Sequence, residues 1–184
     1  MADFPSTVTT ERLVASRCDV DSELGQYAAV FGDERVGGPM WPAHLGGART
    51  RAQTHDFLNR FDAHWTAHGF GPWTVRERDG GGFVGQVGLG YAIVGGSAEV
   101  EVGFVLAHEH WGKGYAAEAT RAALEHAPAL RGLTSVVAFA MADNARALAT
   151  LDRCGFAHES DTVIFDLDVR NYRVAVGQRS AGAA

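Results

Sequence analysis

The residues of this chain best suited to chemistry lie within 101–118, where a predicted strand leads into a glycine-containing loop and then a helix. Gly112 and Gly114 stand in the loop, and the helix is predicted to begin near Tyr115. The first turn of a helix leaves backbone N–H groups without partners, and the helix dipole is positive there. Glycine lets a backbone approach an anion with no Cβ in the way. The segment 111–116 is therefore predicted to be a diphosphate cradle.

Two familiar phosphate-binding loops can be compared with this segment. A P-loop requires Ser or Thr after its Gly-Lys pair, but Gly114 follows Lys113 here. The dinucleotide pattern Gly-x-Gly-x-x-Gly/Ala does match Gly112, Gly114 and Ala117. That pattern belongs in a parallel βαβ unit with an acidic residue about 20 positions later. Here it follows a predicted antiparallel meander, and residues 126–142 contain no acid. A nucleotide-binding oxidoreductase therefore stays an alternative to be tested.

Two histidines, His108 and His110, lie next to the loop. Histidine has a reference pKa of about 6.5, which suits a general base, although loop histidines are commonly just solvated. A metal site built on the His-x-His pair would need a third ligand close by, and none is near in the sequence. We expect no metal ion.

The elements that position the loop follow from hydrophobic periodicity and turn residues. Strands are expected at 9–17, 73–78, 83–94, 99–106, 133–141 and 162–169, helices at about 24–31, 50–68, 115–127 and 144–153, and a loop at 32–48. The central strands are joined by links too short for a crossover, so they must form an antiparallel meander. The expected fold class is α+β, a mixed α/β architecture.

Composition sets limits on the whole chain. It has 184 residues, 46% hydrophobic and 21% charged, which suits one globular domain, expected at 7–172 with a flexible tail at 173–184. The net charge is −6 and Lys113 is the single lysine, so no basic surface for nucleic acid is expected. Two cysteines, Cys18 and Cys154, predict packed reduced thiols. No signal peptide or spanning segment is evident, and we expect a cytoplasmic protein without a membrane partner.

Three segments of the sequence, including the glycine loop, resemble those of a known family. The segment Trp111-Gly-Lys-Gly-Tyr-Ala116 is similar to the acetyl-CoA pyrophosphate loop of the GNAT N-acetyltransferase superfamily, whose pattern is Gln/Arg-x-x-Gly-x-Gly/Ala. Trp111 stands at the Gln/Arg position, which is typical of the branch resembling ribosomal-protein N-terminal (Rim-type) acetyltransferases. Asp143-Asn144 before a helix ending in Cys154-Gly155-Phe156, and the opening Thr10-Glu11-Arg12-Leu13, are also similar to that branch.

The resemblance implies a fold and a donor substrate. The fold would be a largely antiparallel twisted sheet flanked by helices, with two strands splayed into a V that receives acetyl-CoA. The pantetheine arm would pair with backbone groups of strand 99–106, and the pyrophosphate would lie on the glycine loop. The cofactor-binding residues implied are Phe104, Val105, Leu106, Gly112, Lys113, Gly114, Tyr115, Ala116, Ala117 and Asn144. Asn144 could equally be only a helix N-cap.

The implied reaction transfers acetyl directly to a primary amine, of a peptide or a small molecule. Glu101 is the implied general base, because family members often place a Glu on this strand ahead of its aromatic residue; otherwise it is a solvated strand residue. An N–H donor near Val105 would stabilise the thioester oxygen. Many relatives carry a Tyr that protonates the leaving thiolate and a Ser after the Asn. Leu151 and Ala147 replace them here.

The acceptor pocket is expected between residues 32–48 and the chain after Phe156, with Phe31 and Trp41 as substrate contacts, although Trp41 could be either a lid residue or simple packing. An α-amine has a pKa of about 7.7–8.0 and is easier to deprotonate than a lysine amine at about 10.4, so it is the favoured acceptor. A non-catalytic CoA-binding or interaction module of the same fold is the alternative. A homodimer is possible, because the related branch often dimerises.

Overall fold

The computed structural model describes residues 3–94, 96–164 and 166–177. The helices are α1 (Val20–Phe31), α2 (Gly37–Met40), α3 (Arg51–His68), α4 (Tyr115–His126) and α5 (Ala145–Arg153). The strands are β1 (Thr7–Thr9), β2 (Leu13–Arg17), β3 (Pro72–Glu77), β4 (Phe83–Val94), β5 (Ser97–Leu106), β6 (Ser135–Met141), β7 (Ala157–Ile164) and β8 (Leu167–Ala175). Short 3-10 helices lie at Ala43–Leu45, His108–His110 and Ala127–Ala129.

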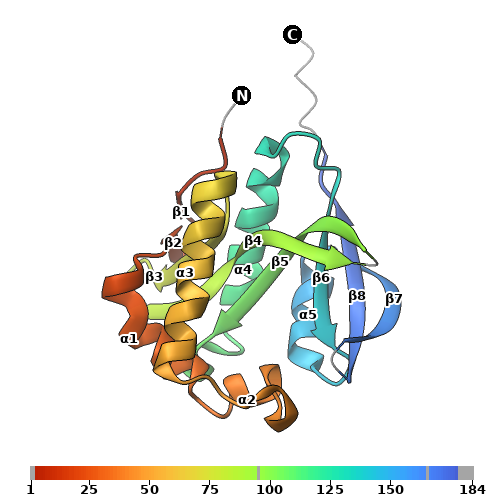
Figure 1. The fold of residues 1–184 in the computed structure, drawn as a ribbon. Coiled ribbons are helices and arrows are strands. Elements are labelled where there is room, and N and C mark those ends of the chain that lie inside the picture. The colour runs from red at the N-terminus through yellow and green to blue at the C-terminus, as the bar shows by residue number, and fades with distance from the viewer. Residues whose placement is uncertain (1–2, 95, 165, 178–184) are drawn as a thin grey trace.

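The eight strands form one sheet in the order β1-β2-β3-β4-β5-β6-β8-β7. Neighbours are antiparallel except β5 and β6, which are parallel and pair at Glu101↔Val137, the single register pair within the described residues. Beyond that pair, toward the ends of both strands, β5 and β6 diverge (Figure 1). This opening is the V-shaped splay, and it confirms the predicted fold class.

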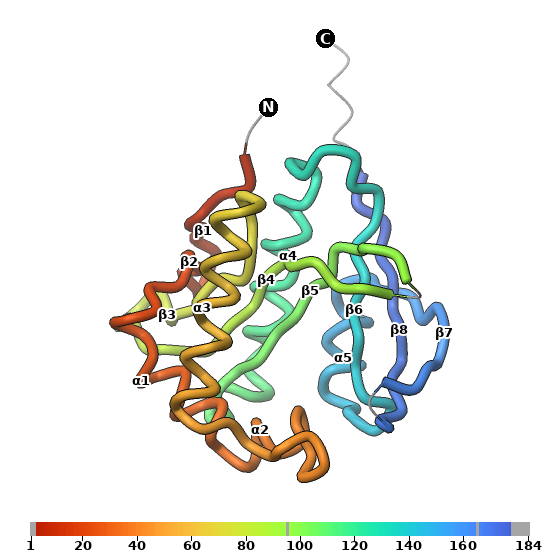
Figure 2. Tube along the Cα trace, viewed as in Figure 1, coloured from red at the N-terminus to blue at the C-terminus, as the bar shows by residue number. Residues whose placement is uncertain are grey.

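Helices cover both faces of the sheet. Figure 2 shows α1 and α3 in front of the sheet and α4 behind it. The front layer is held by a cluster of buried aromatic and aliphatic side chains that includes Tyr27, Phe31, Leu58 and Val105. On the other side, α4 presents small residues to the strands, with Ala123 fully buried. Small side chains let the helix backbone lie close to the sheet, which keeps its N-terminus near the end of β5.

Helix α3 begins and ends where its sequence predicts. The Thr50 hydroxyl accepts from the Gln53 N–H at 3.3 Å, and the Gln53 side chain accepts from the Thr50 N–H at 2.9 Å, which completes a capping box. Gly69 ends the helix with φ of 72°, a left-handed conformation that glycine adopts without strain.

Several predicted boundaries are wrong for physical reasons. The strand expected at 162–169 is in fact the end of β7 and the start of β8, joined by a turn in which Asp166 has φ of 63°. Asp tolerates this left-handed conformation, so the turn needs neither Gly nor Pro to mark it. The strand expected at 9–17 is β1 and β2 with a bend between them. The loop at 32–48 contains α2 and a 3-10 helix.

The C-terminal boundary also moves. Strand β8 pairs with β6 through Ser135↔Ala175, and Val176 is buried, so the tail predicted from 173 begins too early. Residues 178–184, and Gly95 in the β4–β5 turn, lie outside the described residues. Among the helices described, none combines the length and apolarity that crossing a membrane requires.

Candidate active site

The glycine loop opens α4 as predicted. Gly112 and Gly114 have φ of 76° and 81°, and Gly114 is the N-cap residue of α4. No side chain of the described residues caps this end of the helix, so the N–H groups of its first turn are available to an anion. A Cβ on Gly112 would meet nothing within 4 Å, so its glycine is needed for the positive φ and not for space.

The loop is held against the end of β5 by Trp111. Its indole Nε1–H donates to the Leu106 carbonyl at 2.9 Å. The side chains of Lys113 and Tyr115 point away from the cradle: Lys113 is exposed, and the Tyr115 hydroxyl donates to Glu77 Oε1 at 3.0 Å. Tyr115 can therefore serve an anion through its backbone N–H. Ala116 is partly buried and Ala117 is buried against the core, so these positions also offer backbone groups alone.

The pairing of β5 decides which of its backbone groups face the splay. The Ala107 N–H donates to the Val84 carbonyl at 2.9 Å, and the β4–β5 register continues unbroken back to Val94↔Ser97. Residues of an antiparallel ladder alternate between pairs that exchange both hydrogen bonds and pairs that exchange none. The odd-numbered residues of β5 therefore bond to β4, and the even-numbered residues direct their N–H and C=O groups toward β6 and the splay.

This alternation corrects the expectation for Val105. Its backbone groups are directed to Gln86 on β4, and its side chain is buried at 8% exposure among the front-layer residues. Within the described part of the chain, the groups that the register directs toward the splay are the N–H and C=O of Phe104 and the N–H of Leu106, whose carbonyl accepts from Trp111. Of the three β5 residues expected to pair with the pantetheine arm, Phe104 and Leu106 therefore direct backbone groups toward the splay and Val105 does not, and the N–H donor expected near Val105 would be one of theirs.

Glu101 lies at the apex of the splay. It pairs with Gly90 on β4 and with Val137 on β6, so it has a strand on each side, and it is partly buried. Burial raises the pKa of its carboxyl to about 7. A carboxylate with that pKa accepts a proton near neutral pH and releases it readily, which suits a general base.

Asn144 is confirmed as the N-cap of α5. Its Oδ1 accepts from the Ala147 N–H at 3.1 Å, while the side chain is exposed and its amide NH₂ stays available as a donor. Leu151, at the position of the family's Tyr, is fully buried in the core, which accounts for an aliphatic residue there. The two roles suggested for Asn144 are therefore geometrically compatible.

The two histidines of the loop face different neighbours. His108 Nδ1 lies 3.3 Å from Arg35 Nη1, and its ring lies 4.8 Å from that of Trp111. His110 Nδ1 lies 3.7 Å from Glu77 Oε1. Both histidines contact residues around the cradle loop, whereas Glu101 is at the apex of the splay.

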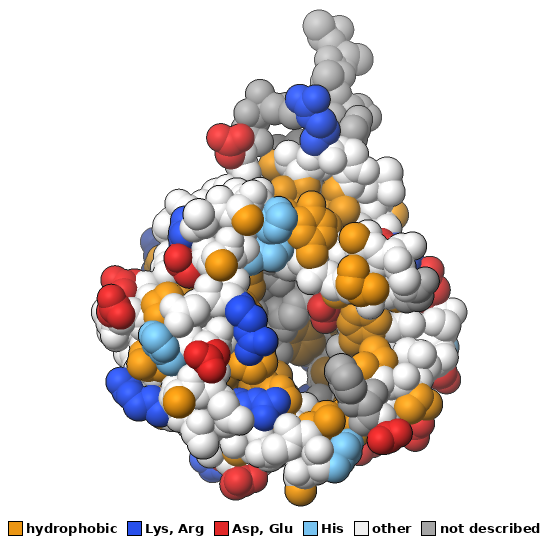
Figure 3. Space-filling model, viewed as in Figure 1, with side chains coloured by type: hydrophobic (Ala, Val, Ile, Leu, Met, Phe, Trp, Pro, Cys, Tyr) orange, Lys and Arg blue, Asp and Glu red, His pale blue; other side chains and the backbone are white. Residues whose placement is uncertain are grey.

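Phe31 and Trp41, the expected acceptor contacts, both belong to the cluster of the front layer. The face in Figure 3 is hollowed near its centre, between α3 and strands β5 and β6, with basic and hydrophobic side chains along the α3 margin. Trp41 is partly buried, and its ring centroid lies 5.4 Å from the ring centroids of both Phe31 and Phe57. The Arg49 guanidinium lies 4.5 Å from the Trp41 ring centroid. Phe31 is 2% exposed, which argues against direct substrate contact and for support of Trp41.

The sequence did not predict that two arginines contact the cradle: Arg146 was not singled out, and Arg12 was noted only as part of the opening motif. Arg146, in the first turn of α5, places its guanidinium 5.1 Å from the Trp111 ring centroid and so reaches from one arm of the splay to the other. Arg12 contacts the loop from the segment before β2. Neither could be found from local spacing, because both contacts join distant parts of the sequence. A cavity of about 400 Å³ lies elsewhere, between the C-terminal half of α4 and the end of β8.

Comparison with known proteins agrees with this geometry. An acetyltransferase (GNAT) domain model matches residues 12–157. The uncharacterized protein YkkB of Bacillus subtilis is 27% identical over 157 residues, which cover 85% of this chain and 87% of that protein. An acetyltransferase from Agrobacterium tumefaciens has a similar structure, with a TM-score of 0.76 at 24% identity, over 95% of this chain and 96% of that one.

Two further structural neighbours were solved with CoA. RimL, a ribosomal L7/L12 α-N-protein acetyltransferase in complex with CoA, has a TM-score of 0.73 at 14% identity, over 96% of this chain and 99% of that one. Spermidine N-acetyltransferase from Vibrio cholerae, in complex with CoA and spermine, has a TM-score of 0.70 at 18% identity, over 91% of this chain and 97% of that one. At these identities the neighbours establish the fold, and the family model matches most of the sequence. The chain belongs to the GNAT acetyltransferase family.

Proposed function

We propose that this protein is an acetyl-CoA-dependent N-acetyltransferase that transfers acetyl directly to a primary amine. One observation carries the proposal: an uncapped helix N-terminus, a strand edge with free backbone groups and a carboxyl with pKa about 7 meet along one splay. These features suit a diphosphate, an amide-rich arm and an amine proton in that order along the cleft.

The residues present fit the donor substrate. Backbone N–H groups of the α4 first turn, behind Gly112 and Gly114, would hold the diphosphate. Phe104 and Leu106 would pair with the pantetheine amides as an added strand would, and the Asn144 amide would donate to the same arm. Acetyl-CoA supplies the acetyl group in activated form, as a thioester.

In the proposed reaction the amine nitrogen attacks the thioester carbon, a C–N bond forms and the C–S bond breaks. Glu101, directly or through one water, accepts the proton that the amine loses. A β5 N–H at Phe104 or Leu106 stabilises the negative charge that develops on the thioester oxygen. The thiolate leaves and takes its proton from water, because buried Leu151 cannot supply one. A thiol pKa of about 8.5 keeps that last step inexpensive near neutral pH.

We propose an α-amine as the acceptor class. A carboxylate of pKa about 7 is a weak base toward a lysine ammonium of pKa about 10.4, but is well matched to an α-ammonium of about 7.7–8.0. The name of RimL, an α-N-protein acetyltransferase, is consistent with this choice, while the spermidine enzyme shows that the fold also serves small amines. A homodimer and a cytoplasmic location remain parts of this proposal.

The test is thiol release from acetyl-CoA in the presence of an amine panel. The panel should contain peptides with a free α-amine, the same peptides N-blocked but bearing lysine, polyamines and aminoglycosides. Release of free thiol with α-amine peptides and mass gain of one acetyl supports the proposal. Release with the lysine peptides alone would contradict the acceptor class. CoA binding without release for any amine would favour the alternative, a non-catalytic module.

A further inference from the structure

We infer that Arg12 is a positioning residue for the cradle: its guanidinium holds the Lys113 carbonyl turned outward, so that the Gly114 N–H points at the diphosphate. The inference rests on the proposed function, since it assumes that the diphosphate of CoA occupies the loop. Arg12 itself touches neither substrate in this scheme. It acts through the backbone of the loop.

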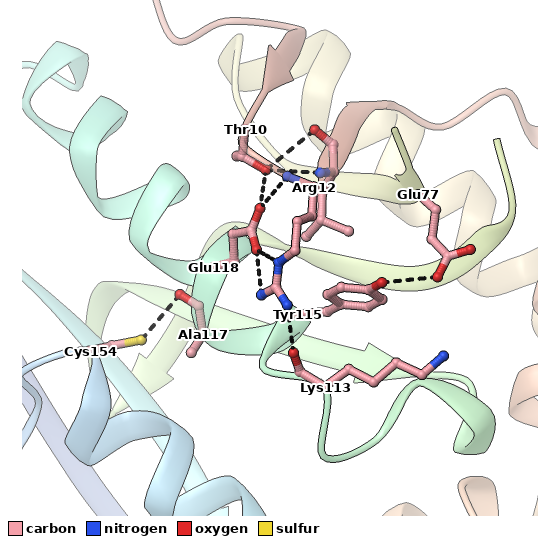
Figure 4. Close-up of polar contacts among 9 residues, drawn as sticks. Thr10, Arg12, Glu77, Lys113, Tyr115, Ala117, Glu118 and Cys154 are labelled. Atoms are coloured by element: carbon pink, nitrogen blue, oxygen red, sulfur yellow. Dashed lines mark hydrogen bonds and ion pairs between the residues drawn. The ribbon is translucent and has the colours of Figure 1, made fainter. Parts of the chain in front are cut away.

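The contacts form a closed network (Figure 4). Arg12 Nη1 donates to the Lys113 carbonyl at 2.9 Å, and Arg12 Nε donates to Glu118 Oε2 at 2.7 Å. The Arg12 backbone N–H and the Thr10 hydroxyl both donate to the other Glu118 oxygen, at 2.9 Å and 2.6 Å. The segment before β2 is thus tied both to the loop and to the first turn of α4.

Because the peptide group is planar, the hydrogen bond from Arg12 to the Lys113 carbonyl also sets the direction of the Gly114 N–H. The carbonyl of Lys113 and the N–H of Gly114 belong to one planar trans peptide and point in opposite directions. Fixing the carbonyl toward Arg12 therefore fixes the N–H toward the other side of the loop. Gly114, with φ of 81°, is free to follow, and an added Cβ would lie 3.5 Å from Arg12 Nη2. A loop without this tether could rotate the peptide and present a carbonyl to the diphosphate.

The same guanidinium also offsets the charge of Glu118. A carboxylate in the first turn of α4 interacts favourably with the helix dipole, but it repels a diphosphate bound at the same helix end. The Glu118 side chain is 15% exposed and lies 2.6 Å from Arg12 Nη2. Burial raises the pKa of Glu118, but the hydrogen bonds from Thr10 and Arg12 outweigh it and leave the pKa below its usual value. Glu118 therefore stays ionised and paired. Orientation and neutralisation are separable effects of Arg12, and we assign the orientation as decisive.

The first test is Arg12→Met, which keeps the apolar stem and removes the donors. Titration calorimetry with CoA is expected to show about a tenfold rise in Kd, the loss expected for one charge-assisted hydrogen bond. The ratio of kcat/KM for acetyl-CoA over S-acetylpantetheine is expected to fall by a similar factor, because the shorter thioester lacks the diphosphate. A merely structural role would lower both kcat/KM values equally.

A matched control removes a similar arginine tether at the far end of β2. Arg17 Nη2 pairs with Asp62 Oδ1 at 2.6 Å and donates to Thr66 at 2.7 Å, which ties the strand to α3 and not to the loop. Arg17→Met is expected to leave the Kd for CoA unchanged. An equal loss of CoA affinity in this variant would overturn the inference.

A double variant separates orientation from neutralisation, and it also avoids leaving a buried charge unpaired if the single variant folds poorly. In Arg12→Met/Glu118→Gln the repulsion is gone but the Lys113 carbonyl stays free, so CoA affinity is expected to remain about tenfold weak. Restored affinity would overturn the inference. So would a single variant that binds CoA as tightly as the wild type. If the wild type itself bound no CoA, the proposed function would fail together with the inference.

Discussion

At the scale of single residues, the placement of Glu101 makes a pH profile the most direct probe. Its carboxyl has a pKa of about 7 through burial, and only the carboxylate can accept a proton. We expect kcat/KM to rise with pH through about 7 and Glu101→Gln to lower turnover by roughly 10²–10⁴ while the Kd for CoA is unchanged. Glu99→Gln is the matched control, since Glu99 lies on the same strand but pairs with Arg173.

The same carboxyl links pH to folding. A carboxyl whose pKa is raised on folding binds more protons in the native state, so its contribution to stability falls as pH rises from about 4.5 to about 7. Glu101→Gln should therefore be more stable than the wild type above pH 7, by about 1–3 kcal/mol after allowing for its partial exposure. Urea unfolding at pH 5 and pH 8 measures this. A variant that is less stable at pH 8 would argue against a costly buried carboxylate.

Lys113 offers a second residue-scale test, because it is the chain's single lysine and is exposed on the cradle loop. An amine-reactive acylating reagent should modify Lys113 and the N-terminal amine, and peptide mapping by mass spectrometry separates the two sites. Because the Lys113 side chain points away from the cradle, CoA is expected to leave the modification of both amines unchanged. Protection of Lys113 by CoA but not by pantetheine, which lacks the diphosphate, would contradict a cradle made of backbone groups alone.

At the scale of elements, sequence patterns predicted most of what positions the site. The strong periodicity of α3, α4, β4 and β5 and the capping residues of α3 and α5 are local, and all of these elements are confirmed. The β7–β8 hairpin was missed because its turn relies on Asp166, whose left-handed conformation carries no Gly or Pro to mark it. Strand alternation also could not assign Val105, since only the register against β4 decides which backbone groups stay free.

Side-chain contacts between elements that are distant in the sequence could not be predicted from local patterns. Arg12 was noticed as part of a motif, but its partner Glu118 is 106 residues away, and no local pattern links them. The Arg146–Trp111 contact joins the two arms of the splay in the same manner. These contacts depend on the tertiary arrangement, which is why the outline of the cradle was predictable and its support was not.

One tie between elements should itself depend on pH. His64 of α3 accepts the Tyr91 N–H of β4 at Nε2, at 3.1 Å, and its Nδ1 lies 2.8 Å from the Phe70 carbonyl, to which it must donate. A protonated ring has no acceptor, so protonation breaks the bond to Tyr91. Burial, together with His68 nearby, lowers the pKa of His64 despite the Phe70 carbonyl.

The sign of this effect follows from the lowered pKa. The native state binds fewer protons than the unfolded chain, so the stabilisation is fully present above pH 6.5 and is lost as pH falls through the lower native pKa. Thermal unfolding between pH 7.5 and 5 should show a smaller loss for His64→Gln, which keeps an acceptor that does not titrate. His68→Gln removes only the neighbouring charge and keeps the bond to Tyr91, so it is expected to retain the pH-dependent loss, and identical curves for all three proteins would exclude the coupling.

At the scale of the whole molecule, the two arms of the splay meet at one strand pair and would be bridged by the donor substrate. The β5 ladder predicts how that bridge appears in amide exchange. Without CoA, the Val105 N–H is bonded to β4 and should exchange slowly, while the N–H groups of Phe104 and Leu106 face the splay and should exchange quickly. With CoA, the pantetheine arm should slow Phe104 and Leu106 and leave Val105 almost unchanged.

Exchange measured by NMR resolves these three neighbouring amides. Pantetheine alone, at a concentration that compensates for weaker binding, should give the same pattern on β5 without slowing the amides of the α4 first turn at Tyr115 and Ala116. CoA should slow both sets, because it alone carries the diphosphate. Protection confined to α4 would show that the ligand binds the cradle without entering the splay. Protection of Val105 in place of its neighbours would contradict the register on which the site is built.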